Sequence, residues 1–207
     1  MPTPRKQRTQ DDGLQARDRL LEAGTRLFSE RGYAATSVGA ICESAGVGKP
    51  ALYWHFESKE GLLVAVLEAL NARWIDEITK QTAVVADPEH RLQRLIAGLR
   101  RLAVEEPQLL RLPTLAALEQ ATASDAIRSG VLSIWDQGSR AICRGTAAVT
   151  GAPEERYEPM AFVVLGLLSS AAVRYSIDGD LDRLDRNLAA MERAVRALVG
   201  AVPEASK

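Results

Sequence analysis

Residues 36–59 constrain the fold of this chain more than any other segment. Their apolar spacing predicts two short helices, about 36–44 and 48–56, separated by a three-residue turn centred on Gly46. Glycine gives such a turn the backbone freedom that it requires. Pro50 is acceptable in the first turn of the second helix, because the N–H that proline lacks has no partner there. Two short helices joined in this way form a helix-turn-helix.

The rest of the chain carries helical rather than strand patterns. Alternating β-branched and aromatic runs are absent, and aromatic residues make up only 5% of the sequence. We therefore predict an all-α fold of about nine helices. Besides the two short helices, they cover about residues 14–31, 58–81, 87–105, 107–121, 124–149, 153–177 and 181–200. Gly32 is expected to end the first of these, and Pro113 to kink the sixth or delay its start.

These patterns divide the chain into three predicted parts. Residues 1–13, with two prolines and several basic residues, are expected to be a disordered arm, and its contact with a minor groove stays an open alternative. Residues 14–74 form the helix-turn-helix domain, and residues 75–207 form a second helical domain. The longest nearly uninterrupted apolar stretch, 160–173, is 14 residues, whereas a membrane span needs about 20. With no secretory signal, the sequence predicts a cytoplasmic protein without a membrane partner.

The cysteines and histidines suggest neither a cofactor nor a catalytic site. Cys42 and Cys143 lie far apart and lack metal-ligand spacing, so they are expected to pack as small apolar side chains in a reducing compartment. His55 has only His90 as a second histidine and no partners at triad-like spacing. We predict no metal, no cofactor and no enzymatic activity.

The second short helix has an outward face suited to DNA. Six apolar residues would lock the motif against the first helix: Val38, Ile41, Ala45, Val47, Leu52 and Phe56. The remaining face then carries Lys49, Ala51, Tyr53, Trp54 and His55, which is basic and aromatic without an acid and fits a major groove. That Tyr53 and Trp54 are core aromatics is the alternative. The formal net charge of −1 gives no support to nucleic-acid binding, so the prediction depends on these positions alone.

Four further motifs occur in a fixed order over about residues 14–74. They are RLFSERGY at 26–33, AGV at 45–47, LYWHF at 52–56 and SKE at 58–60. With them the chain resembles the tetracycline-repressor (TetR) family. The resemblance implies a homodimer that binds a palindromic double-stranded DNA operator and releases it when a small, largely apolar inducer binds. The chain departs from the family at Gly39 and Ala40, where polar residues are usual.

The resemblance also implies roles for individual residues. Tyr53, His55 and Lys59 would contact phosphates, and Thr36, followed by Ser37, would present the N-terminus of the first short helix to the DNA backbone. Lys49, Pro50, Ala51 and Trp54 would face base edges.

The last two helices predict how the subunits assemble. The final helix has an apolar seam with a 3-4 spacing, which requires a partner helix. We expect it to form a four-helix bundle with the preceding helix and their copies in a second subunit. The predicted interface consists of Phe162, Leu181, Leu184, Leu188, Met191, Val195 and Leu198. A bundle formed within one chain is the alternative.

A ligand pocket is expected in the C-terminal part, between the fourth and eighth helices. Its predicted lining consists of Trp74, Arg111, Leu115, Glu119, Trp135, Phe162, Arg174 and Tyr175. The sequence thus predicts a ligand-responsive transcriptional regulator, a repressor rather than an activator. Two alternatives remain open: a helical carrier or enzyme that does not bind DNA, and a constitutive DNA-binding protein without a ligand.

Overall fold

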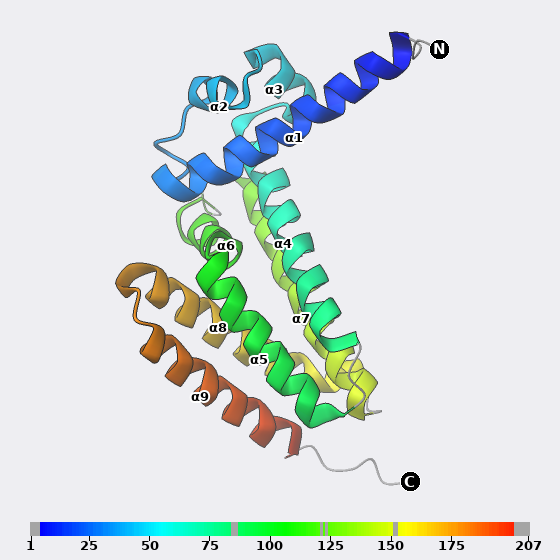
Figure 1. The fold of residues 1–207 in the computed structure, drawn as a ribbon, viewed down its shortest axis with the longest axis vertical. Helices are drawn as coiled ribbons and strands as arrows, with labels where there is room; N and C mark the ends of the chain where they lie inside the picture. Colours follow the sequence, from blue (N-terminus) through cyan, green and yellow to red (C-terminus); the bar gives the residue numbers. More distant parts are fainter. Residues whose placement is uncertain (1–4, 84–86, 121, 123, 151–152, 201–207) are drawn as a thin grey trace. The chain divides into compact units, whose positions relative to one another are not determined.

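The computed structural model describes residues 5–83, 87–120, 122, 124–150 and 153–200 of the chain (Figure 1). Within these residues it contains nine α-helices, one short 3₁₀ helix and no strand, so the all-helical prediction is confirmed. The α-helices are α1 (Arg5–Arg31), α2 (Val38–Ala45), α3 (Lys49–Phe56), α4 (Lys59–Ala83), α5 (Pro88–Glu105), α6 (Gln108–Glu119), α7 (Asp125–Thr150), α8 (Glu158–Asp178) and α9 (Leu181–Gly200). The 3₁₀ helix, η1 (Glu154–Tyr157), precedes α8.

Two helix boundaries differ from the sequence prediction. Helix α1 begins at Arg5, so residues 5–13 have helical backbone where a disordered arm was predicted, and residues 1–4 lie outside the described part. Arginine, lysine and glutamine have high helix propensity even without an apolar stripe, and this extends the helix. Pro113 lies inside α6, which begins five residues earlier, so the proline does not delay the helix.

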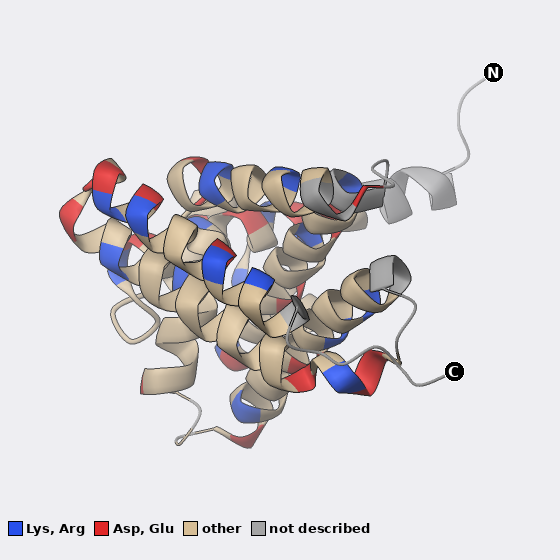
Figure 2. Cartoon of the chain, turned by 90° about the horizontal axis from the view of Figure 1, so that it is seen from below, with Lys and Arg blue, Asp and Glu red and all other residues tan. Residues whose placement is uncertain are grey.

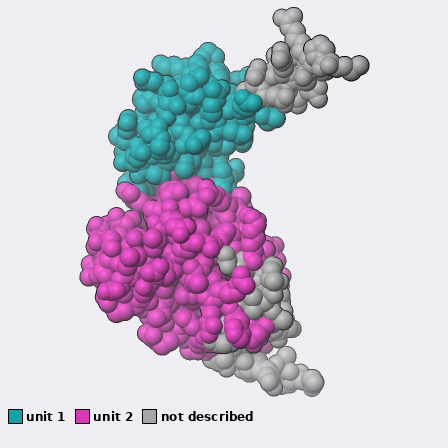
Figure 3. Space-filling view, viewed as in Figure 1, with its two compact units in different colours: residues 1–69, 115–131 teal, residues 70–114, 132–207 magenta. Residues whose placement is uncertain are grey.

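The chain divides into two compact units (Figure 3). Unit 1 comprises residues 1–69 and 115–131, and unit 2 comprises residues 70–114 and 132–207. The sequence had assigned 115–131 to the second domain. Within unit 1 this segment packs on the start of α4: a Cβ placed on Gly130 would lie 3.2 Å from a methyl group of Val64, and the hydroxyl of Ser124 donates to the carboxylate of Glu60 over 3.4 Å.

The core of unit 1 joins α1 to the helix-turn-helix and to the first turns of α4. Helix α1 supplies Leu20, Leu27 and Phe28, all at most 2% exposed, whereas Leu14, nearer its N-terminus, is 57% exposed. Gly24 allows a close approach, since a Cβ there would lie 3.3 Å from side-chain atoms of α4. The buried residues of α4 in this unit are Leu62, Leu63, Val66 and Leu67.

The core of unit 2 contains the apolar seam of α9. Leu184, Leu188 and Met191 are each 2% exposed, and α9 packs on α8 and α5 of the same chain. The prediction that these three side chains form the subunit interface is therefore wrong, and the alternative of a bundle within one chain describes them. The seam does have partner helices, as its spacing required, but they come from its own subunit.

Helix α8 is apolar on two sides. Its inner side, which includes Met160, Val164 and Leu168, is buried against neighbouring elements of unit 2. Its other side leaves Phe162 and Ile177 70% and 77% exposed. With η1, the helix forms one segment, Glu154–Asp178, that is long and apolar enough to cross a membrane by length and composition alone. A helix that packs in a protein core on one side and is apolar on the other has the same composition.

The two cysteines are free and buried, as predicted for residues that pack as small apolar groups. Burial raises the pKa of both thiols, which disfavours the reactive thiolate. Among the described residues no group of three or more His, Cys, Asp or Glu could hold a metal ion.

Candidate nucleic-acid interface

The N-terminus of α2 is capped by Ser37. Its backbone is extended, and its hydroxyl accepts a hydrogen bond from the Ala40 N–H over 3.1 Å. Thr36, which the resemblance placed at this N-terminus facing the DNA backbone, is 1% exposed, and its hydroxyl donates to the carbonyls of Leu27 and Gly32. Thr36 therefore ties α2 to the end of α1, and its buried side chain cannot reach a phosphate.

The turn between α2 and α3 has the conformation that its glycine predicted. Gly46 adopts φ 64° and ψ 36°, the left-handed region, and ends α2. The Val47 N–H then donates to the Cys42 carbonyl over 3.0 Å. Helix α3 starts after Gly48, with Pro50 in its first turn. The local sequence is sufficient for this geometry.

Helix α3 presents the predicted face to solvent. Leu52 and Phe56 are 0% and 6% exposed and anchor it in unit 1, whereas Trp54 is 79% exposed and Tyr53 50%. The reading of these two aromatics as core residues is thus wrong. On the same helix Lys49 and Pro50 are exposed, and Ala51 and His55 are half-buried. The Trp54 and His55 rings meet edge-on with centroids 4.5 Å apart, which orients the indole.

A tight junction links α3 to α4, and no sequence pattern predicted it. Glu57 has φ 64°, which is strained for any residue with a Cβ, and the Ser58 N–H bonds back to the Phe56 carbonyl over 2.6 Å. The Ser58 hydroxyl then accepts from the Gly61 N–H over 3.0 Å, as expected of a cap. A Cβ on Gly61 would lie only 2.1 Å from the Phe56 carbonyl oxygen. The junction fixes the end of α3 against α4.

The ammonium group of Lys59 makes its contacts within the protein. Its ammonium donates to the carbonyls of Tyr33 and Thr36, both over 3.0 Å, and lies 4.1 Å from the centroid of the Tyr33 ring. Burial, and secondarily the charge of Glu60, raises the pKa of the Tyr33 phenol. An ammonium has three N–H donors, so at most one is left for a phosphate. The main contacts of Lys59 hold the α1–α2 connection.

No single sign of charge dominates the molecule. Lys and Arg are interspersed with Asp and Glu along the helices (Figure 2). Around the motif, the Arg17 guanidinium lies 5.5 Å from the centroid of Phe56, and Arg26 donates to Ser44 over 2.5 Å and pairs with Glu30. The character of the α3 face therefore comes from its own residues.

This arrangement of α1 to α4 matches a known family. The family model described as bacterial regulatory proteins, tetR family, covers residues 20–66, which include the whole helix-turn-helix. Residues 20–66 thus form a TetR-family domain. The resemblance drawn from the sequence motifs is thereby confirmed.

Individual relatives show how far the likeness extends. The transcriptional regulator TtgR of Pseudomonas putida is 41% identical over 64 residues, which is 31% of this chain and 30% of TtgR. The transcriptional repressor NicS, also of Pseudomonas putida, is 30% identical over 104 residues, 50% of this chain and 49% of NicS. The chain thus matches less than half the length of these two relatives. Both are named as transcriptional regulators, in line with the prediction that the chain is not an enzyme.

Solved structures extend the likeness to the fold of the C-terminal part. A putative transcriptional regulator from Pseudomonas aeruginosa PAO1 superposes with a TM-score of 0.73 over 89% of this chain and 90% of the other, at 18% sequence identity. At this identity the similarity concerns the fold alone.

The residues predicted to line a ligand pocket divide between the two units. Leu115 and Glu119 belong to unit 1, whereas the other six predicted residues belong to unit 2. Of those, Trp135 is 46% exposed, and Arg174 pairs with Asp178 on the surface. Phe162 lies on the exposed side of α8, while Arg111 is exposed and Tyr175 half-buried. Helical spacing placed these residues on helices without showing which way each helix faces.

Trp74 alone among the pocket candidates is a buried aromatic with an unused polar group. It is 5% exposed, and its indole N–H has no hydrogen-bond partner among the described residues. A Cβ on Gly138 would lie 3.4 Å from its ring, so α7 packs directly on it.

Unit 2 instead has an open groove of about 430 Å³ between α4 and α7. Its lining consists of Ala72, Ile75, Asp76, Gln137, Arg140 and Arg144. None of these residues was predicted from the sequence, because no local motif marks them.

Proposed function

We propose that this TetR-family protein is a cytoplasmic transcriptional regulator that binds double-stranded DNA through α3. The observation that carries the proposal is Trp54, which is 79% exposed on a helix otherwise anchored by Leu52 and Phe56. A monomeric protein gains nothing by showing an indole to water, whereas a major groove offers thymine methyl groups and base edges. Lys49, Pro50 and Ala51 would share the base-facing role.

The phosphate contacts proposed for this surface come from the same helix and its neighbour. Tyr53 and His55 lie on α3 and would reach the DNA backbone. Ser37 would present the N-terminus of α2 to a phosphate, since that terminus has free backbone N–H groups and a favourable dipole.

The proposed active form is a homodimer on a palindromic operator. A recognition helix in each half-site requires two subunits with about 34–36 Å between half-site centres. The exposed side of α8 supports this assembly. It contains Phe162, Val163, Gly166, Leu167, Ser170, Arg174 and Ile177, and we call it the α8 outer face. With Leu181 and Leu198, which are about 40% exposed on α9, it replaces the buried seam as the proposed interface.

We further propose that the regulator is a repressor released from its operator by a small-molecule inducer. Its relative NicS is named a transcriptional repressor, and it matches 50% of this chain, more than the helix-turn-helix alone. Unit 2 would receive the inducer. A protein that stayed on its operator with every effector would instead act constitutively.

Trp54→Ala tests DNA binding directly. We expect unchanged thermal stability and an operator affinity weaker by about 1–3 kcal/mol, measured by fluorescence anisotropy on the DNA upstream of its own gene. Leu52→Ala is the matched control for the inward side of α3 and should lower the free energy of unfolding by about 2–5 kcal/mol. Unchanged DNA affinity in a folded Trp54→Ala variant would refute the assignment of α3.

A further inference from the structure

The groove between α4 and α7 carries two arginines without a carboxylate partner. Arg140 and Arg144 lie four residues apart on α7, so both project on the same side of that helix. Within the described residues, neither guanidinium takes part in an ion pair. Other arginines on the helices of unit 2, such as Arg73, Arg100 and Arg101, pair with an acid. The two groove arginines are therefore available to an anion.

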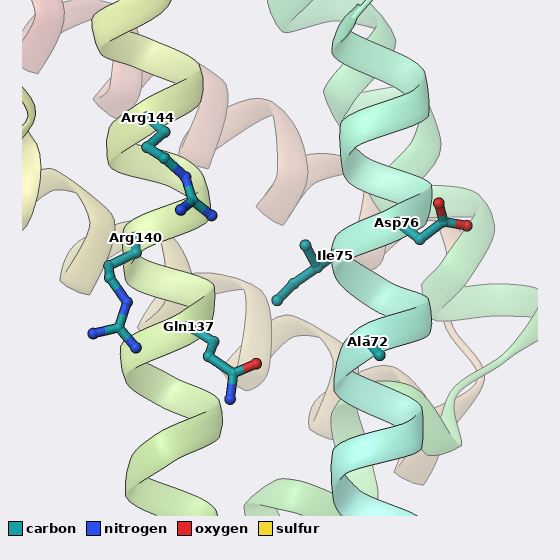
Figure 4. A pocket seen from close by; sticks show the side chains of 6 residues that line it. All are labelled: Ala72, Ile75, Asp76, Gln137, Arg140 and Arg144. Carbon is teal, nitrogen blue, oxygen red and sulfur yellow. The ribbon is translucent and has the colours of Figure 1, made fainter.

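The one acid of the groove does not cancel this charge. The Asp76 carboxylate accepts a bond from Lys80 over 2.5 Å, one turn along α4. Figure 4 shows the Asp76 side chain pointing away from α7. The charge balance of the groove is thus positive, and the positive charge comes from α7.

Apart from Asp76, the opposite wall of the groove is apolar. Ala72 and Ile75 line it from α4, and Ile75 points toward α7 (Figure 4). Gln137 closes the same space from α7: its carbonyl accepts from the buried Asn71 over 3.1 Å, and its amide donates to Ser133 over 3.0 Å. These two bonds orient the side-chain amide of Gln137 and leave one of its N–H groups free. The groove thus combines two cations, a positioned amide and an aliphatic surface.

We propose that this groove binds a small organic anion, a carboxylate or phosphate group on a short apolar body, and that this anion is the effector of the regulator. Guanidinium groups recognise both anions through paired N–H donors. The volume of about 430 Å³ lies within the range of small-molecule sites, which is about 300–1,000 Å³. The effector role rests on the proposed function, whereas the binding site itself depends only on the groove.

Calorimetry on the full-length protein tests the site. The probes are octanoate, octyl phosphate, octan-1-ol and inorganic sulfate. We expect octanoate or octyl phosphate to bind with one site per chain, and the comparison between them identifies the preferred head group. Octan-1-ol lacks the charge and sulfate lacks the apolar body, so both should bind about tenfold more weakly or worse.

Two variants and a control assign the binding to the groove. The double variant Arg140→Gln/Arg144→Gln should lose about tenfold to a hundredfold in affinity for the organic anion, because the charge-assisted bonds are gone. Ile75→Asn should weaken octanoate more than butanoate, because it removes apolar contact with the longer chain. Arg94→Gln, an exposed arginine on α5 outside the groove, should bind as the wild type does.

Several results would overturn the proposal. They are unchanged affinity in the double variant, octan-1-ol or sulfate binding as tightly as octanoate, and no binding of either organic anion. A separate measurement tests the effector role: the organic anion should release operator DNA from the wild-type protein but not from the double variant. If the protein bound no DNA, the proposed function would fail while calorimetry still decided the groove. Binding without release would overturn the effector role alone.

Discussion

At Gly61 a single backbone oxygen decides which residue can stand there. A Cβ at this position would lie 2.1 Å from the Phe56 carbonyl, far inside contact distance. The oxygen belongs to the backbone at the strained junction around Glu57, so it cannot move like the end of a side chain. The first turn of α4 therefore requires glycine.

Gly61→Ala is expected to lower the free energy of unfolding by about 1–3 kcal/mol, the usual cost of inserting a methyl group into a packed contact. Urea denaturation measures the change. Gly145→Ala is the matched control, because that glycine also lies inside a helix and a Cβ there meets nothing within 4 Å. The control should gain up to about 1 kcal/mol from helix propensity. Equal effects in the two variants would show that the contact with the Phe56 carbonyl is not the cause.

At the scale of elements, Lys59 holds three helices together. It stands in the first turn of α4, and its ammonium bonds the carbonyls of Tyr33 and Thr36 in the α1–α2 connection. Thr36 in turn bonds back to the end of α1. These contacts position the helix-turn-helix, so a residue predicted to touch DNA has a structural role in the protein.

Lys59→Ala should lower the free energy of unfolding by about 1–3 kcal/mol, since two carbonyls lose a charged donor. Lys80→Ala is the control: it removes the exposed ion pair between Lys80 and Asp76, one helical turn apart, and should change the free energy of unfolding by less than about 0.5 kcal/mol. Both are measured by urea denaturation. The salt dependence of DNA binding provides the second test: a slope lowered by about one unit in Lys59→Ala would show that the remaining N–H also contacts a phosphate.

For the whole molecule, the two sides of the α8–α9 pair have different roles. The seam of α9 closes the core of its own subunit, whereas the α8 outer face is exposed and is the surface that we propose for the second subunit. Phe162, 70% exposed, stands on that outer face, whereas Leu188, 2% exposed, stands in the seam. A charge introduced at each position should therefore have a different consequence.

Phe162→Glu should leave the fold intact and dissociate the dimer, because an unpaired carboxylate in the interface costs several kcal/mol. Leu188→Glu should unfold unit 2. Analytical ultracentrifugation at micromolar concentration and circular dichroism separate these outcomes, and a folded Phe162→Glu monomer should lose high-affinity operator binding. If Phe162→Glu remained a dimer with normal DNA affinity, the subunit interface would lie elsewhere.

The sequence by itself determined the features that depend on neighbours along the chain. Helix periodicity, the glycines at 32 and 46 and the inward positions of Leu52 and Phe56 are local, and each was found where predicted. The exposure of Trp54 followed from them, since a helix of eight residues that buries Leu52 and Phe56 has one side left.

Only the tertiary structure decided which of two competing apolar faces is buried and which partner a charged group takes. The seam of α9 and the outer face of α8 are both apolar, and helical spacing alone does not predict which of the two faces is buried within its own subunit. Lys59, Thr36 and Gly61 depend on backbone oxygens brought near by folding, and the arginines of the α4–α7 groove are marked by no motif. These features depend on contacts between residues distant in sequence, whereas helix periodicity and capping record only local preferences.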